Sequence, residues 1–261
     1  VAAKALKGAA ALDYEAIDET LAETAAYMAT EHPDYGALAG RLAVARLHER
    51  TSASLAEALL ALDDETDAVT GEPCRVLDGG FRDALERDAA VRAAVDGALA
   101  HGRDFEGLDY FGFKTLERSY LLRHRGGAEG GGVAERPQHL LMRCALGIHR
   151  GWEGPDALAR SLEAYDLLSR KRVMHASPTL FHAGLRRAHL SSCFLLGSTE
   201  DSIEGIYATL GRCAAISKAA GGIGLSAGDI RAAGSKIRGT GGESNGLVPV
   251  LRVFDATARY V

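Results

Sequence analysis

Residues 190–227 constrain the fold most, because a short apolar run, a helical pattern and a second short apolar run follow one another there. Residues 190–196 have the length and composition of a buried strand, and Gly197 begins a turn. Apolar side chains then recur on one face of a helix, at Ile203, Ile206, Tyr207, Leu210 and Ala214. Residues 223–227 form the second run. The order strand, helix, strand predicts a parallel α/β arrangement with functional groups at the strand ends.

The helix of this unit has recognisable ends, and a glycine-rich segment follows it. Asp201, with Glu204 three residues later, resembles a capping box, and Gly221 with Gly222 is expected to end the helix. Nine glycines lie within residues 221–246, in a region that also carries the cations Lys218, Arg231, Lys236 and Arg238. Backbone N–H groups at glycines approach a phosphate closely, so the segment is either a nucleotide-binding loop or a mobile surface loop. It lacks the spacing of a P-loop, and spacing alone favours the surface loop.

The sequence before residue 190 is predicted to be helical. Apolar residues recur at helical spacing over residues 14–62, with a break at residues 32–34 (HPD). Helix signals continue over residues 63–104, where the acidic run at 63–67 is interpreted as a solvated surface rather than a metal site. Two loops are predicted at glycine-containing stretches, residues 126–132 and 151–155.

Composition excludes several classes of protein. The 261 residues are 47% hydrophobic and 25% charged, enough for one sizeable core or two modest ones. The net charge of −5 provides no broad cationic field, so we expect no nucleic-acid polymer as partner. No apolar run reaches the length of a membrane span, and the start of the chain lacks a signal-peptide cleavage pattern, so we expect an intracellular protein without a membrane partner. The four cysteines form no CxxC pair, which argues against a zinc site and a disulfide framework.

Several motifs in this order and spacing resemble those of the large, catalytic subunit of aerobic, eukaryotic-type (class I) ribonucleotide reductases. In the second half they are HASPTLFHAG (175–184), LSSC (190–193), DSIEG (201–205), ISKAAGGIG (216–224) and SNGLVP (244–249). In the first half HPDY (32–35), YFGFKTLERSY (110–120) and ERPQH (135–139) are similar to the helical domain of that family. The resemblance implies a remnant of an ATP-binding cone at residues 1–20, an α-helical domain at 21–189, and the opening part of a ten-stranded α/β barrel at 190–261. By the same resemblance the barrel is incomplete in this chain.

The resemblance implies that the family's radical cysteine is Cys193. In that family a thiyl radical removes the ribose 3′-hydrogen, and ribonucleoside diphosphates are reduced to deoxyribonucleoside diphosphates for DNA synthesis. Without the resemblance, a cysteine flanked by apolar residues is normally core filler. Three further positions match substrate-contacting residues of the family, namely Ser177, Ser192 and Gly222. For the two serines, turn capping and strand-edge hydrogen bonding stay open as alternatives. The remaining cysteines match no catalytic position and are interpreted as structural thiols: Cys74, Cys144 and Cys213.

A second group of residues matches the family's allosteric specificity site, where a deoxynucleoside triphosphate or ATP binds at the dimer interface. The matching residues are Asp201, Ser202, Ile203, Lys218, Arg231, Arg238 and Gly239. Asp201 and Ser202 stand where a helix starts and its N–H groups point outward, and we expect Lys218 and Arg231 to neutralise phosphates. The alternative is an ordinary capped helix with surface cations. Asp18 is the one residue that matches the family's activity site.

The family also implies partners and cofactors. We expect a cytoplasmic homodimer that works with a separate small subunit carrying the metal-radical cofactor. The chain itself is expected to bind nucleotides, with Mg²⁺ accompanying the effector, but no metal through its own side chains. Without the missing barrel motifs it is expected to be inactive alone. The competing hypothesis is a non-catalytic nucleotide-binding or dimerisation module derived from the same family.

Overall fold

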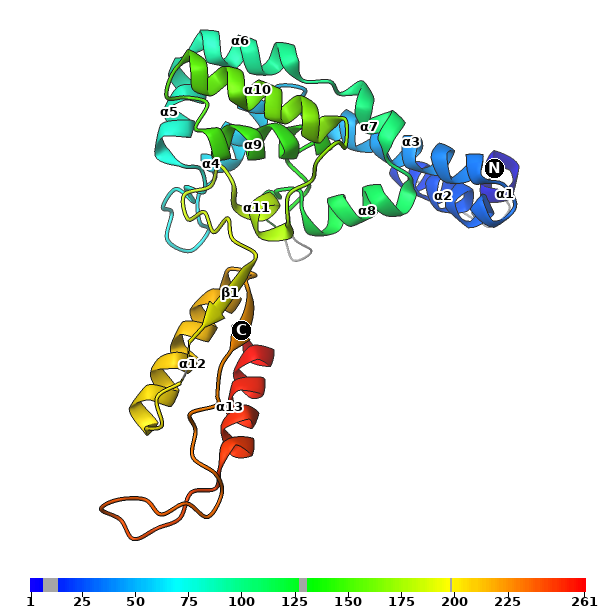
Figure 1. Cartoon of the computed structure of the whole chain (residues 1–261). Coiled ribbons are helices and arrows are strands. Elements are labelled where there is room, and N and C mark those ends of the chain that lie inside the picture. Colours follow the sequence, from blue (N-terminus) through cyan, green and yellow to red (C-terminus); the bar gives the residue numbers. More distant parts are fainter. Residues whose placement is uncertain (7–13, 127–130, 198) are drawn as a thin grey trace. The chain divides into compact units, whose positions relative to one another are not determined.

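The computed structural model describes residues 1–6, 14–126, 131–197 and 199–261, and it divides into two compact units (Figure 1). The first unit comprises Val1–His175 and Leu180–Ala188, and the second comprises Ala176–Thr179 and His189–Val261. The proposed cone remnant at residues 1–20 and the glycine-rich loop at 126–132 both lie partly outside the described residues. None of the described helices is both long enough and apolar enough to cross a membrane.

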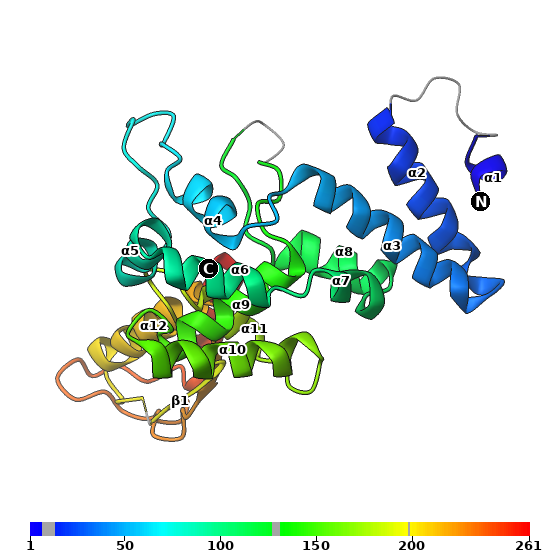
Figure 2. The same cartoon turned by 90° about the horizontal axis from the view of Figure 1, so that it is seen from above.

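The first unit is built from helices, as the sequence predicts (Figure 2). They are α1 (Ala2–Leu6), α2 (Tyr14–Tyr27), the 3-10 helix η1 (Met28–Thr30), α3 (Pro33–Arg50), α4 (Leu55–Asp63), α5 (Gly79–Arg87), α6 (Ala89–Ala98), α7 (Gly102–Gly107), α8 (Tyr110–Ser119), α9 (Pro137–His149), α10 (Pro155–Ser169) and α11 (Ser177–His182), of which α11 continues from the second unit. The expected break at residues 32–34 is confirmed. His32 caps α3 through an Nδ1 atom that accepts a hydrogen bond from the Asp34 N–H at 3.2 Å, and Pro33 occupies the first helical position.

Helix α9 organises the interior of this unit, because its side chains enter two separate hydrophobic clusters. Met142 and Leu146 pack into a cluster with residues of α4, α5, α6 and α10. Leu140 and Cys144 pack into a second cluster with residues of α3, α8 and α11. The predicted turn after α9 is confirmed, with Arg150 in the left-handed conformation at φ 51° and α10 starting at Pro155. One helix therefore ties both halves of the unit together.

A buried ion pair joins α9 to the segment before it and to the end of α11. Glu135 and Arg143 are both fully buried, and Arg143 Nε donates to Glu135 Oε1 at 2.6 Å. The remaining guanidinium donors bind backbone carbonyls, with Nη1 2.7 Å from the Ala183 oxygen and Nη2 3.2 Å from the Leu180 oxygen. Both charged groups of this pair are therefore hydrogen-bonded, as buried charges must be.

The sequence predicts that the acidic run at residues 63–67 is a solvated surface. This prediction is wrong for Asp63, whose side chain is buried and only 1% exposed. Its Oδ1 accepts hydrogen bonds from the N–H groups of Val76 at 2.6 Å and Leu77 at 2.9 Å, and Arg82 Nη1 donates to its Oδ2 at 2.7 Å. Burial alone raises the pKa of Asp63, but these hydrogen bonds lower it below its ordinary value. Asp63 therefore anchors the loop that follows α4.

The second unit has the predicted strand, helix, strand order, extended by one further helix. It contains β1 (Cys193–Leu196), α12 (Ile203–Lys218), β2 (Gly222–Leu225) and α13 (Leu247–Tyr260). The two strands pair in parallel, and Cys193 stands opposite Gly222. The Gly222 N–H donates to the Ser192 oxygen at 2.7 Å, and the Ser226 N–H donates to the Leu196 oxygen at 3.3 Å. The parallel α/β arrangement is thus confirmed.

Strand β1 is not buried, contrary to expectation. Cys193 is exposed and Leu195 is 90% exposed, whereas Phe194 and Leu196 are half-buried. Residues alternate between the two faces of a sheet, so Cys193 and Leu195 share one face with their register partners Gly222 and Gly224. Helices α12 and α13 pack against the other face, on Ile223 and Leu225. Among the described residues of this unit no helix or strand covers the Cys193 face, which explains the exposure.

Helix α12 differs from the expectation at both ends. Its N-cap is Ser202 rather than Asp201, because the Ser202 Oγ accepts a hydrogen bond from the Gly205 N–H at 3.0 Å. It ends at Lys218, and Ala220, not a glycine, takes the left-handed conformation at φ 60°. The expected apolar face is only partly covered in the chain, since Ile203 is 68% and Tyr207 57% exposed whereas Ile206, Leu210 and Ala214 are half-buried.

Candidate functional site

Cys193 is the first residue of β1 and lies on the open face of the sheet beside Gly222. A Cβ atom built on Gly222 would stand 4.0 Å from the Cys193 Sγ and 3.4 Å from the Ser192 oxygen. Because Gly222 has no side chain, the space over its backbone next to the thiol stays open. Half-buried Ser192 directly precedes the cysteine. The structure therefore brings Ser192, Cys193 and Gly222 together at one end of the sheet.

Ser177 belongs to the same compact unit as Cys193. It is the first residue of α11 and is half-buried. The Thr179 Oγ1 donates to the Leu190 oxygen at 2.9 Å, which fixes the start of α11 to the chain just before β1. The four residues predicted to act on the substrate are therefore all held in the second unit.

A cavity of about 360 Å³ lies beside the start of α12 and contains four of the predicted effector residues. Its lining consists of Asp201, Ser202, Ile203, Ile206, Ile230, Arg231, Ile237, Glu243, Ser244, Asn245, Gly246, Pro249 and Val250. Apolar side chains of α12 and α13 form part of the wall, and polar groups gather at the start of α12. A cavity of this size with a few convergent polar groups suits a small ligand.

The charges in this cavity are already paired. Arg231 Nε donates to Asp201 Oδ2 at 2.6 Å, and Arg231 Nη2 donates to the Asp201 oxygen at 3.1 Å. The hydrogen bond from Arg231 lowers the pKa of the Asp201 carboxyl below its ordinary value. A phosphate that binds Arg231 must therefore share it with Asp201.

Three predicted effector residues do not line this cavity. Lys218 is the last residue of α12, so in one chain it stands about 22 Å from the start of that helix, at roughly 1.5 Å per residue. Arg238 and Gly239 lie in an exposed turn closed by the ion pair Lys236 Nζ–Glu243 Oε1 at 2.7 Å, with Gly239 at φ +84°. Within one chain Lys218 and Arg231 therefore stand at opposite ends of α12.

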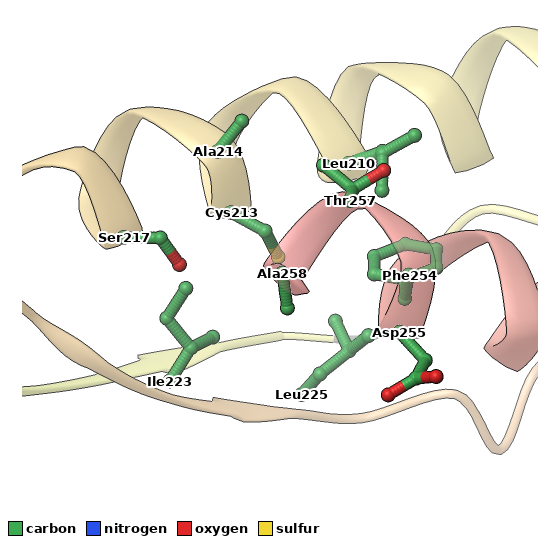
Figure 3. Close-up of a pocket in the computed structure, with 10 residues that line it drawn as sticks. All are labelled: Leu210, Cys213, Ala214, Ser217, Ile223, Leu225, Phe254, Asp255, Thr257 and Ala258. Carbon is green, nitrogen blue, oxygen red and sulfur yellow. The ribbon is translucent and has the colours of Figure 1, made fainter. Parts of the chain in front are cut away.

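The other singled-out residues lie elsewhere. Asp18 is a half-buried residue of α2 in the first unit. Burial raises the pKa of the Cys144 thiol to about 11, and burial also raises the pKa of Cys213, which lines an apolar groove between α12, β2 and α13 (Figure 3). Cys74 is buried and lies 3.2 Å from Arg125 Nη1. Thiols with raised pKa are poor nucleophiles, in keeping with structural roles for Cys144 and Cys213.

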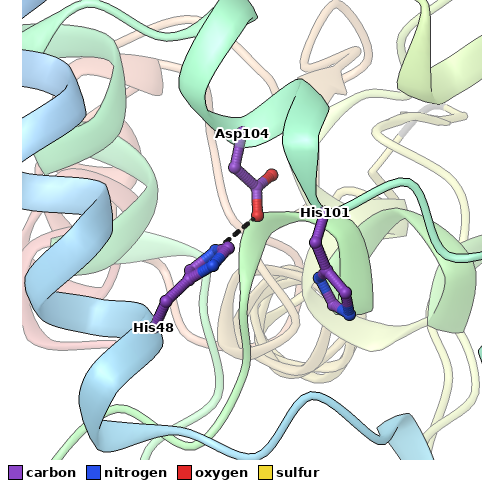
Figure 4. Close-up of side chains that lie close together, drawn as sticks. All are labelled: His48, His101 and Asp104. Carbon is purple, nitrogen blue, oxygen red and sulfur yellow. Dashed lines mark hydrogen bonds and ion pairs between the residues drawn. The ribbon is translucent and has the colours of Figure 1, made fainter.

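Sequence reasoning missed one cluster of potential metal ligands in the first unit, formed by His48, His101 and Asp104 (Figure 4). His48 lies in the last turn of α3, His101 directly precedes α7 and Asp104 lies in the first turn of α7. The spacing of three residues between His101 and Asp104 is the one local signal, and His48 joins them only through the packing of α3 against α7.

Comparison with known protein families gives two matches that follow one another along the chain. Residues 106–188 match the ribonucleotide reductase all-alpha domain, and residues 191–261 match the ribonucleotide reductase barrel domain. The first match lies in the helical unit except for residues 176–179, and the second covers β1, α12, β2 and α13. A helical domain followed by the start of the barrel domain is the predicted fold class, which is thus confirmed.

Individual relatives agree with these matches. The chain is 50% identical over 245 residues to the ribonucleoside-diphosphate reductase large subunit of Arabidopsis thaliana, covering 94% of this chain and 28% of that protein. It is 49% identical to the large chain of Schizosaccharomyces pombe with the same coverage, and 46% identical to the large subunit of Variola virus, of which it covers 30%. The chain thus spans less than a third of these relatives. Both domain matches and these identities show that the chain belongs to the family of ribonucleotide reductase large subunits.

Proposed function

We propose that this protein is the large subunit of a ribonucleoside-diphosphate reductase and that Cys193 carries its thiyl radical. One observation supports this most: Cys193 stands on an open face of the sheet, beside a glycine whose missing side chain leaves room over the sulfur. The relatives are all named as reductase subunits, which favours the enzyme over a non-catalytic module.

The proposed step is a hydrogen-atom transfer at the ribose. The Cys193 thiyl radical takes the 3′-hydrogen, so that an S–H bond forms while the C3′–H bond breaks and the radical moves to the sugar. Ser177 and Ser192 offer hydroxyl groups for the diphosphate and the ribose, and Gly222 allows the sugar to approach. The radical is supplied by a small subunit with a metal-radical cofactor, and the two electrons of the reduction come from a pair of other thiols of the full-length protein, which close into a disulfide. The enzyme acts in the cytoplasm.

Regulation is proposed at the cavity beside α12. A deoxynucleoside triphosphate or ATP, accompanied by Mg²⁺, would place its phosphates near Arg231 and the N–H groups at the start of α12. Lys218 stands at the far end of the same helix, so an antiparallel pairing of two α12 helices in a homodimer would bring Lys218 of a second copy to this cavity. Exposed Tyr207, in the second turn of α12, is available for that pairing.

Replacing the sulfur tests the catalytic proposal. In the full-length protein with its small subunit, Cys193→Ser is expected to abolish deoxynucleotide formation, because an alcohol O–H bond resists the radical transfer that a thiol permits. Binding of the substrate diphosphate should stay nearly unchanged. Cys213→Ser is the matched control and should keep its activity. Substantial turnover by Cys193→Ser would remove this residue from the mechanism.

Removing the cations tests the effector site. Lys218→Ala and Arg231→Ala should each weaken deoxynucleoside triphosphate binding roughly ten- to hundredfold, because a charge-assisted hydrogen bond contributes about 1.5–3 kcal/mol. Calorimetric titration of the full-length protein, together with sizing at matched concentrations, measures both affinity and dimerisation. Arg212→Ala, an exposed residue of α12, is the control. Unchanged affinity in both variants would leave these residues as surface cations.

A further inference from the structure

His48, His101 and Asp104 offer one ligand atom each, and these three atoms lie within 4.8 Å of one another in the helical unit. The residues come from two helices, with His48 from α3 and the other two from the start of α7 (Figure 4). Two imidazoles and a carboxylate are the donor set that zinc and related divalent ions prefer. We propose that these residues bind one divalent transition-metal ion of the zinc type, which joins α3 to α7.

Asp104 supplies the electrostatic reason for a cation. It is fully buried, and its oxygens accept hydrogen bonds from His48 Nε2 at 2.9 Å and from Gln138 Nε2 at 2.9 Å. Among the described residues its one ion-pair partner is His48, which carries a charge only when it is protonated. A buried carboxylate that forms no ion pair with a permanent cation is costly to bury, and a metal ion bound directly to it would supply a charge in contact with its oxygens.

His101 supplies a buried nitrogen that has no hydrogen-bond partner. Its Nε2 lies 2.9 Å from the Ala53 oxygen, and because a carbonyl only accepts, that nitrogen carries the proton in the neutral ring. The Nδ1 atom then has a free lone pair, and it is buried without a hydrogen-bond partner in the structure.

The spacing of the other two ligands is close to what a metal requires. Two ligand atoms at about 2.1 Å from a tetrahedral ion are roughly 3.4 Å apart, and His48 Nε2 and Asp104 Oδ2 are 2.9 Å apart. The ion takes the place of the proton that these two atoms share, and a side-chain rotation brings His101 into the first coordination sphere. Water fills the fourth position.

Two neighbouring groups face this cluster and limit the affinity. The Arg136 guanidinium binds the His48 oxygen at 2.9 Å and the Thr51 oxygen at 2.6 Å, and its positive charge opposes a second cation. The His139 ring lies edge-on to His101 with centroids 5.3 Å apart, and burial keeps it neutral by lowering its pKa to about 3. The carboxylate of Asp104 offsets the charge of Arg136, so the site holds its ion with moderate affinity.

The test uses the 261-residue chain without an affinity tag, stripped of metal by a chelator. Titration with Zn²⁺ in a calorimeter should give one equivalent bound at pH 7.5, and Co²⁺ should produce visible bands of a four-coordinate ion. His101→Gln and His48→Gln should each weaken Zn²⁺ binding at least tenfold. His32→Gln, which removes an exposed histidine, should not. Binding should weaken as the pH falls to 5.5, because protons compete for the imidazoles.

The following outcomes would overturn the proposal. Absence of saturable Zn²⁺ binding, or equal loss in His32→Gln and His101→Gln, would mean that the cluster is a hydrogen-bonded group without a metal. Circular dichroism of the metal-free variants checks that they fold. If a variant does not fold, X-ray absorption of the Zn²⁺-loaded natural chain decides, because it counts imidazole ligands, and fewer than two would refute the site. None of these measurements depends on reductase activity.

Discussion

At the scale of single residues, burial sets the charge of the histidines in the helical unit. His139 is fully buried, its Nδ1 accepts a hydrogen bond from the Arg136 N–H at 3.3 Å, and its Nε2 lies 3.2 Å from the Ala53 oxygen. Burial lowers its pKa to about 3, and the neighbouring His101 and Arg136 act in the same direction. A neutral imidazole is therefore a condition of the native packing between α9 and the segment after α3.

This burial makes stability depend on pH. In the unfolded chain the His139 ring has its ordinary pKa of about 6.5, whereas in the native state its pKa is lowered to about 3. Between these values the unfolded state binds more protons, so the free energy of unfolding is highest above pH 6.5 and falls as the pH drops, by up to about 1.4 kcal/mol per unit. Urea unfolding at pH 7.5, 6.0 and 5.0, followed by the fluorescence of Trp152, measures it. The His139→Asn variant lacks the titrating ring, so its free energy of unfolding should depend less on pH. Equal pH dependence in the variant and the natural chain would contradict the prediction.

Residue identities were predictable where they belong to a motif, but their surroundings were not. The motif around Cys193 marks the cysteine, whereas its exposure depends on which face of the sheet the helices cover. Asp63 was misjudged for a similar reason. Its burial depends on Arg82, 19 residues later, and on two backbone N–H groups that only the folded loop presents.

At the scale of helices and strands, the spacing of apolar residues was enough to predict most elements, because that spacing is a local property of the sequence. It located the helical region, the break at residues 32–34 and the parallel strand pair. The start of α12 was placed one residue early, because the Asp201 carboxylate that was expected to cap it is bound by Arg231, 30 residues later. Ser202, itself a residue type that commonly caps helices, takes that position instead and accepts the Gly205 N–H.

Close contact between elements leads to a pair of opposite predictions for helical glycines. A Cβ atom on Gly147 of α9 would stand 2.1 Å from the Gly184 nitrogen, which is backbone and cannot swing away. Gly147→Ala should therefore destabilise the helical unit by about 3 kcal/mol. Gly97 of α6 has open space around its Cβ position, so Gly97→Ala should stabilise by about 0.5–1 kcal/mol. Urea unfolding of both variants checks the signs, and a neutral Gly147→Ala would refute the close approach of α9.

At the scale of the whole molecule, the exposed apolar side chains of α12 and α13 are the main feature left without a partner in the described chain. They include Ile203, Tyr207, Val248 and Leu251, which are 68%, 57%, 61% and 44% exposed. Exposed apolar residues on neighbouring helices are typical of an interface. They fit the proposed homodimer better than an isolated subunit.

Charge placed on these helices should prevent self-association. Tyr207→Glu and Leu251→Glu are each expected to shift the dimer dissociation constant at least tenfold upward, because a carboxylate would have to be desolvated in an apolar contact. Leu167→Glu, at a 41% exposed position of α10, is the matched control and should leave association unchanged. Sedimentation equilibrium over a range of concentrations gives the constants. Association that is equally strong in all four proteins would place the interface elsewhere.

The parallel register of β1 and β2 has a mechanical consequence. Both strands start at the end of the sheet that carries Cys193, so the chain must cross back along the sheet between them. Helix α12 makes this crossing. Its first turn follows Asp201, and its last turn precedes Gly222. A hydrogen-bonded helix is stiff along its axis. A displacement of the Ser202 cap along the axis is therefore carried through the helix to Lys218, and only the short turn at residues 219–221 separates that end from the glycine beside the thiol.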